Sequence, residues 1–199
     1  MQSFIDWIGA NLQWIQIFSL ATGIVFMVMQ IFQHRLMWYF NLLTAAGALL
    51  VAVFSNVWAQ VFMNSYFIVM ALIGIAHWKK LSSESGRQIH IVDPSKKTII
   101  TAAAFVLIGA PIVCTILAFT NDPSPYADGI SMTLSLVAAW FLTRSHSVQW
   151  FLWMAGDVLL IVVYAGTGAW WMVALYYCYI VASCFGYRQW ITKGVKVKA

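Results

Sequence analysis

The chain has 199 residues, of which 62% are hydrophobic and 9% are charged, and its formal net charge is +5. Soluble domains carry about 25% charged residues, so this composition excludes a soluble enzyme or binding module and indicates a polytopic membrane protein. The positive charge needs no nucleic acid to explain it, because membrane topology concentrates Lys and Arg on one side. The three cysteines lie in apolar stretches without metal-ligand spacing, so we expect neither a metal nor a cofactor.

Seven hydrophobic spans are predicted, and the breaks between them contain turn residues or charges. They cover residues 14–32, 37–54, 58–78, 98–120, 127–143, 148–164 and 169–190. Several are shorter than the ~20 residues that a transmembrane helix needs, so we expect them to extend into the interfaces or to cross with little tilt. No soluble stretch is long enough to fold alone, which makes residues 1–199 a single polytopic membrane domain.

The basic residues support this topology. Seven spans place alternate loops on the same side, and all 11 Lys and Arg residues then fall on one side. They are Arg35, Lys79, Lys80, Arg87, Lys96, Lys97, Arg144, Arg188, Lys193, Lys196 and Lys198. The positive-inside rule makes that side cytoplasmic, so we expect the N-terminus outside and the C-terminus in the cytoplasm.

The chain also repeats itself at one constant offset, which is the separation of His34 from His146 (146 − 34). Identical residues in this register are His34/His146, Trp38/Trp150, Trp58/Trp170, Gly74/Gly186, Trp78/Trp190, Ser19/Ser131, Ile68/Ile180 and Val69/Val181. We therefore predict an all-α membrane protein with two parallel three-helix repeats, at about 14–78 and 127–190, joined by a connector helix at about 98–120. Parallel repeats occur in known transporter folds, whose sites tend to lie near the midplane between the halves.

The sixth span contains the strongest candidate for a binding site. Trp150, Trp153 and Asp157 fall on one helical face, and Tyr164 extends that face. Asp157 is the only acidic residue deep inside an apolar segment, roughly 13 Å from the start of its helix and near the middle of a ~30 Å hydrocarbon core. A carboxyl group there is costly unless it faces a bundle interior or a wet cavity. Two indoles beside it predict a pocket for a flat, polar and cationic solute.

Four further polar residues are candidates for the same pocket, each with a structural alternative. Asn41 occupies the repeat position of Trp153, although an interhelical hydrogen bond would explain it equally well. Gln60 and Asn64 share one face of the third span and are predicted to line an outer vestibule, with a purely structural role left open. Tyr176 lies too deep for interfacial anchoring alone to explain it.

Most of the other tryptophans lie near span ends, where anchoring in the interfacial belt is the expected role. This expectation covers Trp7, Trp14, Trp38, Trp58, Trp78, Trp170, Trp171 and Trp190.

Other classes of membrane protein can be compared by what they would require. An intramembrane enzyme needs a nucleophile–base pair or a metal cluster within the spans, and only one deep carboxylate is present. A retinal protein needs a Lys within a span, and none lies there. A narrow channel for polar solutes stays open as an alternative.

The residues of spans 5 to 7 resemble the PnuC family of vitamin transporters. The resemblance rests on Tyr126-Ala127-Asp128 through Arg144, on W-x2-W-x3-D at Trp150, Trp153 and Asp157, and then on Tyr164, Gly168, Leu175-Tyr176 and G-Y-x2-W at Gly186 to Trp190. It implies a 3+1+3 fold, a homotrimer in the inner membrane of a bacterium, and facilitated diffusion of nicotinamide riboside, which a cytoplasmic kinase then traps. Branches of the family carry thiamine, riboflavin or deoxynucleosides instead, and residues 70–74 lack the Gln that is typical of nicotinamide riboside carriers.

Overall fold

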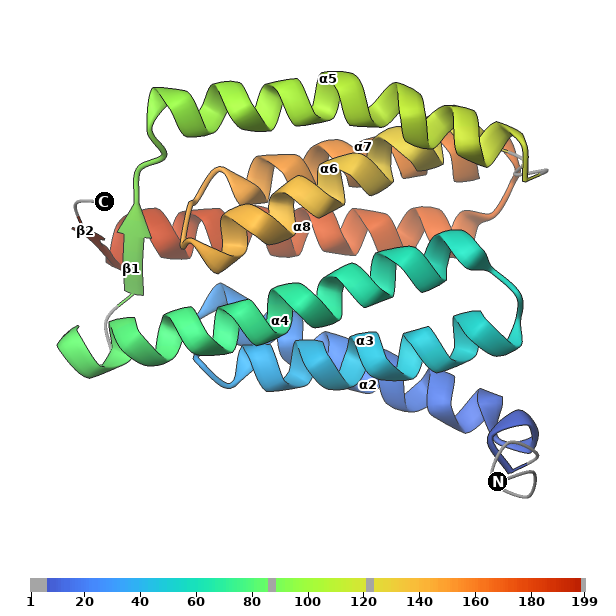
Figure 1. The fold of residues 1–199 in the computed structure, drawn as a ribbon, viewed down its shortest axis with the longest axis horizontal. Helices are drawn as coiled ribbons and strands as arrows, with labels where there is room; N and C mark the ends of the chain where they lie inside the picture. The colour runs from blue at the N-terminus through green and yellow to red at the C-terminus, as the bar shows by residue number, and fades with distance from the viewer. Residues whose placement is uncertain (1–6, 86–88, 121–123, 198–199) are drawn as a thin grey trace. The chain divides into compact units, whose positions relative to one another are not determined.

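The computed structural model describes residues 7–85, 89–120 and 124–197, and it is almost entirely helical. The helices are α2 (Leu12–Ile31), α3 (Met37–Phe54), α4 (Trp58–Ser85), α5 (Lys96–Ala118), α6 (Pro125–Thr143), α7 (Gln149–Gly166) and α8 (Trp170–Lys193) (Figure 1). The predicted all-helical membrane fold is confirmed. Of the basic residues counted above, Arg87 and Lys198 lie outside the described residues.

Within the described ranges, six helices are long and apolar enough to cross a membrane, namely α2, α3, α4, α5, α7 and α8. Many of their large apolar side chains are exposed at the surface of the protein, with Leu107 and Val162 among the most exposed. Exposed apolar surface of this extent is unfavourable in water and suits contact with lipid. Helix α6 has 19 residues but is more polar, since it contains Asp128 and several hydroxyl side chains. Its membrane crossing stays a prediction.

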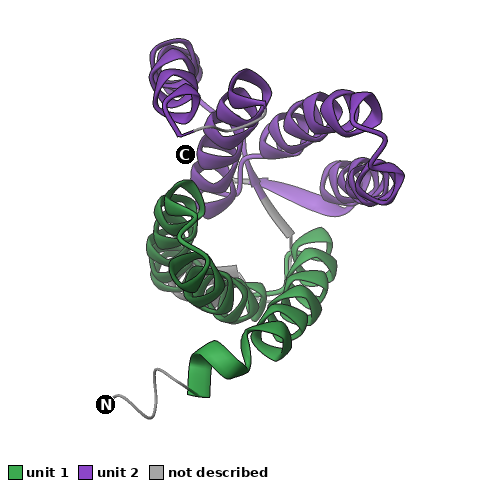
Figure 2. Cartoon of the chain, turned by 90° about the vertical axis from the view of Figure 1, so that its right-hand side faces the viewer, with its two compact units in different colours: residues 1–83 green, residues 84–199 purple. Residues whose placement is uncertain are grey.

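The chain forms two compact units, residues 1–83 and residues 84–199 (Figure 2). In unit 1, α2 packs against α3. In unit 2, α5 packs against α6, α6 against α7, and α7 against α8. The core of unit 2 includes Ala102 of α5 together with Val137 and Phe141 of α6. Small and apolar side chains at these positions allow the helices to approach closely without leaving polar groups in the interior.

In unit 1, a tight contact joins the start of α3 to the membrane-spanning part of α4. Trp38 meets Trp78 edge to face, with ring centroids 5.6 Å apart and an angle of 83° between the ring planes. A Cβ atom at Gly74 would lie within 3.0 Å of three atoms of the Trp38 ring, so only glycine fits there. Trp38 is 1% exposed and Trp78 is buried as well. The prediction that these two tryptophans anchor the chain in the interfacial belt is therefore wrong, because their helix faces turn inward.

The same arrangement occurs in unit 2, at the positions that the repeat in the sequence relates to these. Trp150 meets Trp190 edge to face at 5.6 Å and 87°. A Cβ atom at Gly186 would lie within 3.0 Å of three atoms of the Trp150 ring. Trp190 is fully buried, so belt anchoring was the wrong prediction for it too. The remaining tryptophans of that group are exposed, as anchoring requires: Trp7, Trp14, Trp58, Trp170 and Trp171.

The turns between helices follow the same register. The turn after α2 contains Gln33 with φ of 49°, and the turn after α6 contains Ser145 with φ of 58°. The turn after α3 contains Asn56 with φ of 57°, and the turn after α7 contains Gly168 with φ of 76°. The members of each pair are separated by the offset of the repeat (145 − 33 and 168 − 56). Left-handed backbone is uncommon outside glycine, so its recurrence in this register shows that the paired turns share one geometry.

The structure adds one feature that the sequence analysis missed, a small parallel sheet of β1 (Ile89–Val92) and β2 (Gly194–Val197). Four-residue strands are too short to stand out in a pattern of hydrophobicity. The backbone N–H of Val92 donates to the Ser145 carbonyl at 3.2 Å, and Nδ1 of His146 donates to the Val92 carbonyl at 2.7 Å. Lys196 and Asp93 form an exposed ion pair at 3.0 Å. We call these two strands together with residues 93, 145 and 146 the strand clasp.

The imidazole of His146 is buried within the strand clasp. Burial lowers its pKa, and the Arg144 charge acts in the same direction, whereas the hydrogen bond to Val92 and the Asp93 charge raise it and only partly compensate. The clasp therefore favours a neutral imidazole. His34, which occupies the equivalent turn of unit 1, is exposed.

Candidate functional site

Unit 2 brings three of the predicted site residues together on neighbouring faces of α7 and α8. The rings of Tyr164 and Tyr176 stack with their centroids 5.6 Å apart and their planes 10° apart. Tyr176 also meets Tyr179 edge to face at 5.9 Å. The half-buried carboxyl group of Asp157 lies within electrostatic range of the phenols of Tyr176 and Tyr179. The result is a patch in which one carboxylate and three phenol groups interrupt an otherwise apolar helix pair.

Trp153 lies one helical turn before Asp157 and is half-buried. Its indole Nε1 donates to Oε1 of Gln149 at 3.2 Å, which fixes the orientation of the ring on α7. Gln149 is itself fully buried, so this partner is held in place by the surrounding protein. An aromatic face positioned in this way beside a carboxylate can stack on a planar cation.

Trp150 has a different environment from Trp153, although the two were predicted to share one pocket. It is 2% exposed and is enclosed by the contact with Trp190 and Gly186 described above. Its Nε1 has no hydrogen-bond partner among the described residues. Contact between Trp150 and a solute would therefore require α7 and α8 to separate, whereas Trp153 and Asp157 need no such movement.

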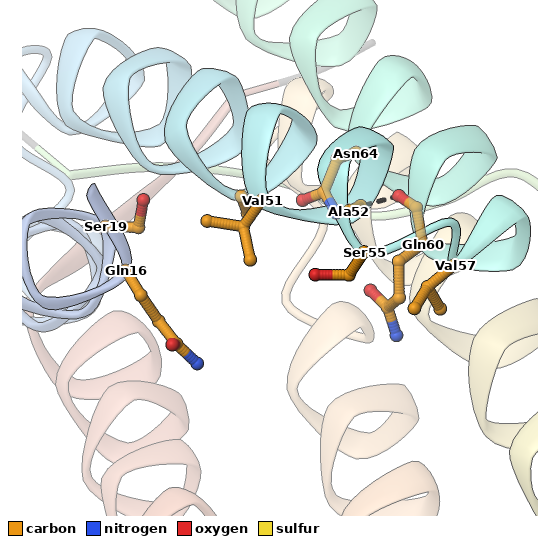
Figure 3. Close-up of a pocket in the computed structure, with 9 residues that line it drawn as sticks. Gln16, Ser19, Val51, Ala52, Ser55, Val57, Gln60 and Asn64 are labelled. Carbon is orange, nitrogen blue, oxygen red and sulfur yellow. Dashed lines mark hydrogen bonds between the residues drawn. The ribbon is translucent and has the colours of Figure 1, made fainter. Parts of the chain in front are cut away.

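Unit 1 contains a separate cavity of about 240 Å³ between α2, α3 and α4. Its lining consists of Gln16, Ser19, Ala48, Val51, Ala52, Ser55, Val57, Gln60 and Asn64 (Figure 3). Figure 3 shows Gln16 and Ser19 of α2 on one side of this cavity and Ser55, Gln60 and Asn64 on the other. Two of the predicted site residues, Gln60 and Asn64, thus lie in one cavity, and the third from this unit, Asn41, is buried in α3 without lining it.

The sequence analysis did not single out Gln16, Ser19 or Ser55 as site residues. The available signal for Gln16 and Ser19 was their helical spacing as polar side chains in the N-terminal half of the first span, and Ser55 is in the turn that follows the second. Ser19 donates to the carbonyl of Ile15 at 2.9 Å, so its hydroxyl is partly satisfied within its own helix. Among the described residues, no three His, Cys, Asp or Glu side chains gather as a metal site would require.

Comparison with known proteins gives consistent results. A family model described as "Nicotinamide mononucleotide transporter" matches residues 13–192. The nicotinamide riboside transporter PnuC of Haemophilus influenzae is 25% identical over 186 residues, which cover 92% of this chain and 81% of that protein. The Escherichia coli protein of the same name is 18% identical over 208 residues, covering 92% and 87%.

A solved structure described as the vitamin B3 transporter PnuC superimposes with a TM-score of 0.69. The match covers 90% of this chain and 81% of that one, at 20% sequence identity. At this level of identity the superposition shows a shared fold.

Proposed function

This chain is a multi-pass membrane transporter of the nicotinamide mononucleotide transporter family, that of the PnuC proteins, and from that premise we propose that its substrate is nicotinamide riboside. The observation that carries this proposal is the family match over residues 13–192, which includes every helix that forms the candidate site. The two relatives described above, each matched over more than four fifths of its length, are named as nicotinamide riboside transporters.

The chemistry of α7 and α8 supports a substrate with a quaternary ring nitrogen. A cation over the face of Trp153 would gain about 0.5–2 kcal/mol from the cation–π interaction. The carboxylate of Asp157, one helical turn away, favours a positive charge in a medium of low dielectric constant. The phenols of Tyr164 and Tyr176 offer hydroxyl groups that can bond to a ribose. Nicotinamide riboside combines a pyridinium ring with a ribose, so both parts would find partners here.

We also propose that transport is facilitated diffusion. Asp157 is the only acidic residue deep within the predicted spans, and a single carboxylate that pairs with the cationic substrate leaves no further group to carry a coupled ion. The chain itself would catalyse no reaction, and a separate cytoplasmic kinase would trap the transported nicotinamide riboside in the cell.

The proposed assembly is a homotrimer in the cytoplasmic membrane of a bacterium, with two repeats, α2–α4 and α6–α8, joined by α5 in a 3+1+3 arrangement. The paired turns and Trp–Gly contacts support this division. The N-terminus would lie outside and the C-terminus in the cytoplasm, as the distribution of Lys and Arg favours.

An uptake panel in sealed liposomes tests the substrate. We expect nicotinamide riboside to enter faster than thiamine, riboflavin or deoxynucleosides. Thiamine is the second candidate, because it also carries a quaternary ring nitrogen and because residues 70–74 lack the Gln typical of nicotinamide riboside carriers. Preference for a neutral solute such as riboflavin would contradict the role given to Asp157.

Binding measurements on purified variants test the site. Trp153→Ala should weaken binding about tenfold to a hundredfold while the protein stays folded, because it removes a stacking partner. Asp157→Asn keeps the shape of the side chain and removes its charge, so the loss should be larger for a cation than for a neutral analogue. Trp171→Ala is the matched control, since that indole is 90% exposed at the start of α8. Normal affinity in a well-folded Trp153→Ala protein would place the site elsewhere.

A further inference from the structure

The cavity of unit 1 corresponds to a space that is filled in unit 2. The offset that relates the Trp–Gly contacts and the turns also relates Ala52 to Tyr164 and Asn64 to Tyr176 (164 − 52 and 176 − 64). In unit 2 the two tyrosine rings stack against each other, whereas in unit 1 the equivalent positions carry a methyl group and a short amide. The opening between α2, α3 and α4 is therefore the space left by two missing aromatic rings.

The size of this opening limits what it can hold. Pockets that enclose a drug-sized ligand have volumes of about 300–1,000 Å³, and the cavity of unit 1 is smaller than that range. A single planar ring fits such a volume, with the remainder of the molecule extending through the open mouth. The neighbouring walls are apolar at Val51 and Ala52, as the flanks of a ring require.

The polar groups of the cavity favour a chemical group that both donates and accepts hydrogen bonds. Asn64 is 7% exposed, and its Nδ2 donates to the backbone carbonyl of Gln60 at 2.8 Å. That bond leaves Oδ1 of Asn64 with no partner among the described residues, so an acceptor remains available. The amides of Gln16 and Gln60 and the hydroxyl of Ser55 add donors and acceptors, and no charged side chain lines the cavity.

We propose that this cavity is an outer subsite of the transporter, where the ring of the arriving solute binds with a carboxamide N–H donating to Oδ1 of Asn64. The proposal rests on the proposed function for the identity of the solute and for the outward orientation of the turn between α3 and α4. A planar heteroaromatic carboxamide has the shape of the missing ring and the donor that Asn64 lacks. The quaternary nitrogen of such a solute is the ring atom that carries the ribose, so with the carboxamide innermost the positive charge lies at the open mouth of the cavity, and no carboxylate is required within it.

A protection assay tests the subsite directly. Ser55 lines the cavity and is exposed, so Ser55→Cys, in a protein whose three native cysteines are replaced, should react with a membrane-impermeant thiol reagent from outside. Nicotinamide, which has the ring and the carboxamide without the ribose, should slow this labelling at least fivefold at saturation. Gly166→Cys is the control, because a side chain at this outer end of unit 2 meets nothing within 4 Å. Its labelling should not respond to nicotinamide.

Two variants then connect protection to the cavity. Asn64→Ala should raise the nicotinamide concentration needed for protection about tenfold, the usual effect of losing one hydrogen bond. Ser65→Ala is its matched control, since Ser65 makes the same kind of bond to its own helix at 2.7 Å and does not line the cavity. The double variant Ala52→Tyr/Asn64→Tyr copies the filled arrangement of unit 2 and should abolish protection while preserving the fold.

The outcomes separate the subsite from the proposed function. If wild-type protein transports nicotinamide riboside and nicotinamide leaves Ser55→Cys labelling unchanged, the subsite is refuted and the function stands. If nicotinamide protects Ser55→Cys and no vitamin of the panel is transported, the function is refuted and the ring-binding cavity stands. Labelling of Ser55→Cys from the cytoplasmic side only, or equal protection in the double variant, would overturn the subsite as well.

Discussion

The contact between Gly186 and Trp150 makes a quantitative prediction about stability. Gly186→Ala places a methyl group within 3.0 Å of three ring atoms of an indole that is 2% exposed. The indole cannot move aside, because Trp190 lies against it with ring centroids 5.6 Å apart. Inserting a methyl group into a packed core costs about 1–3 kcal/mol, and this rigid site should fall at the upper end.

Part of that cost is offset by the better helix propensity of alanine, which is worth about 1 kcal/mol. We therefore expect a net loss of about 1–2 kcal/mol. For a chain of about 150–250 residues, each kcal/mol corresponds to about 2–4 °C, so the apparent Tm should fall by about 2–8 °C. Gly74→Ala, which meets Trp38 in the same way, should produce a similar loss in unit 1.

The assay is thermal unfolding of purified protein in detergent, followed by loss of the monodisperse peak at one heating rate, because unfolding of membrane proteins is often irreversible. Gly166→Ala is the control, since its Cβ would meet nothing within 4 Å, and its Tm should stay unchanged or rise slightly. Adding Trp150→Leu to Gly186→Ala should cancel the effect of the alanine, with a coupling energy of about 1–3 kcal/mol. A Gly186→Ala protein as stable as wild type, or no coupling to Trp150, would refute the packing argument.

Three further predictions concern acid stability, topology and transport. Because the pKa of His146 is lowered in the folded protein, its stabilising contribution is complete above pH ~6.5 and is lost as the pH falls through that lowered pKa. His146→Gln should therefore reduce the acid-induced fall in Tm, whereas His34→Gln should not. Equal profiles of Tm against pH for wild type and His146→Gln would contradict this. Gly166→Cys should react with an impermeant thiol reagent only from outside and Lys97→Cys only from the cytoplasm, and reaction of both from one side would rule out the proposed orientation. Uptake of labelled nicotinamide riboside should stop at equal concentrations on both sides, whereas accumulation that an ionophore abolishes would show ion coupling.

The sequence was sufficient to predict the helices, because each long apolar run has only one way to satisfy its backbone in a membrane. The sequence also identified the residues that recur at the repeat offset, such as Gly74 with Gly186 and Trp38 with Trp150. It did not predict which way Trp38, Trp78 and Trp190 face. Position near a span end is visible in a hydropathy pattern, but the side of the helix that meets another helix depends on tertiary packing.

The candidate site was predicted in part. The face shared by Trp153, Asp157 and Tyr164 follows from helical spacing, but the stacking of Tyr164 on Tyr176 joins two helices and requires the structure. Gln60 and Asn64 of the cavity in unit 1 were predicted as lining residues, whereas Gln16, Ser19 and Ser55 were missed, because the small side chains that leave a cavity open do not stand out in the sequence. The signal in the sequence is a difference between the repeats, since Ala52 stands where the second repeat has Tyr164.

The strand clasp places a condition on how this protein is made. Asp93 and Lys196 are 103 residues apart, so β1, which precedes α5, has no partner strand until the ribosome has synthesised the residues between them. At a synthesis rate of about 5–20 residues per second, that wait lasts about 5–20 s. During this time the edge of β1 is open to other strands, which is a known route to misassembly. A chain that stops before Gly194 lacks β2 and therefore cannot form the sheet, so β1 stays without its partner strand in such a chain.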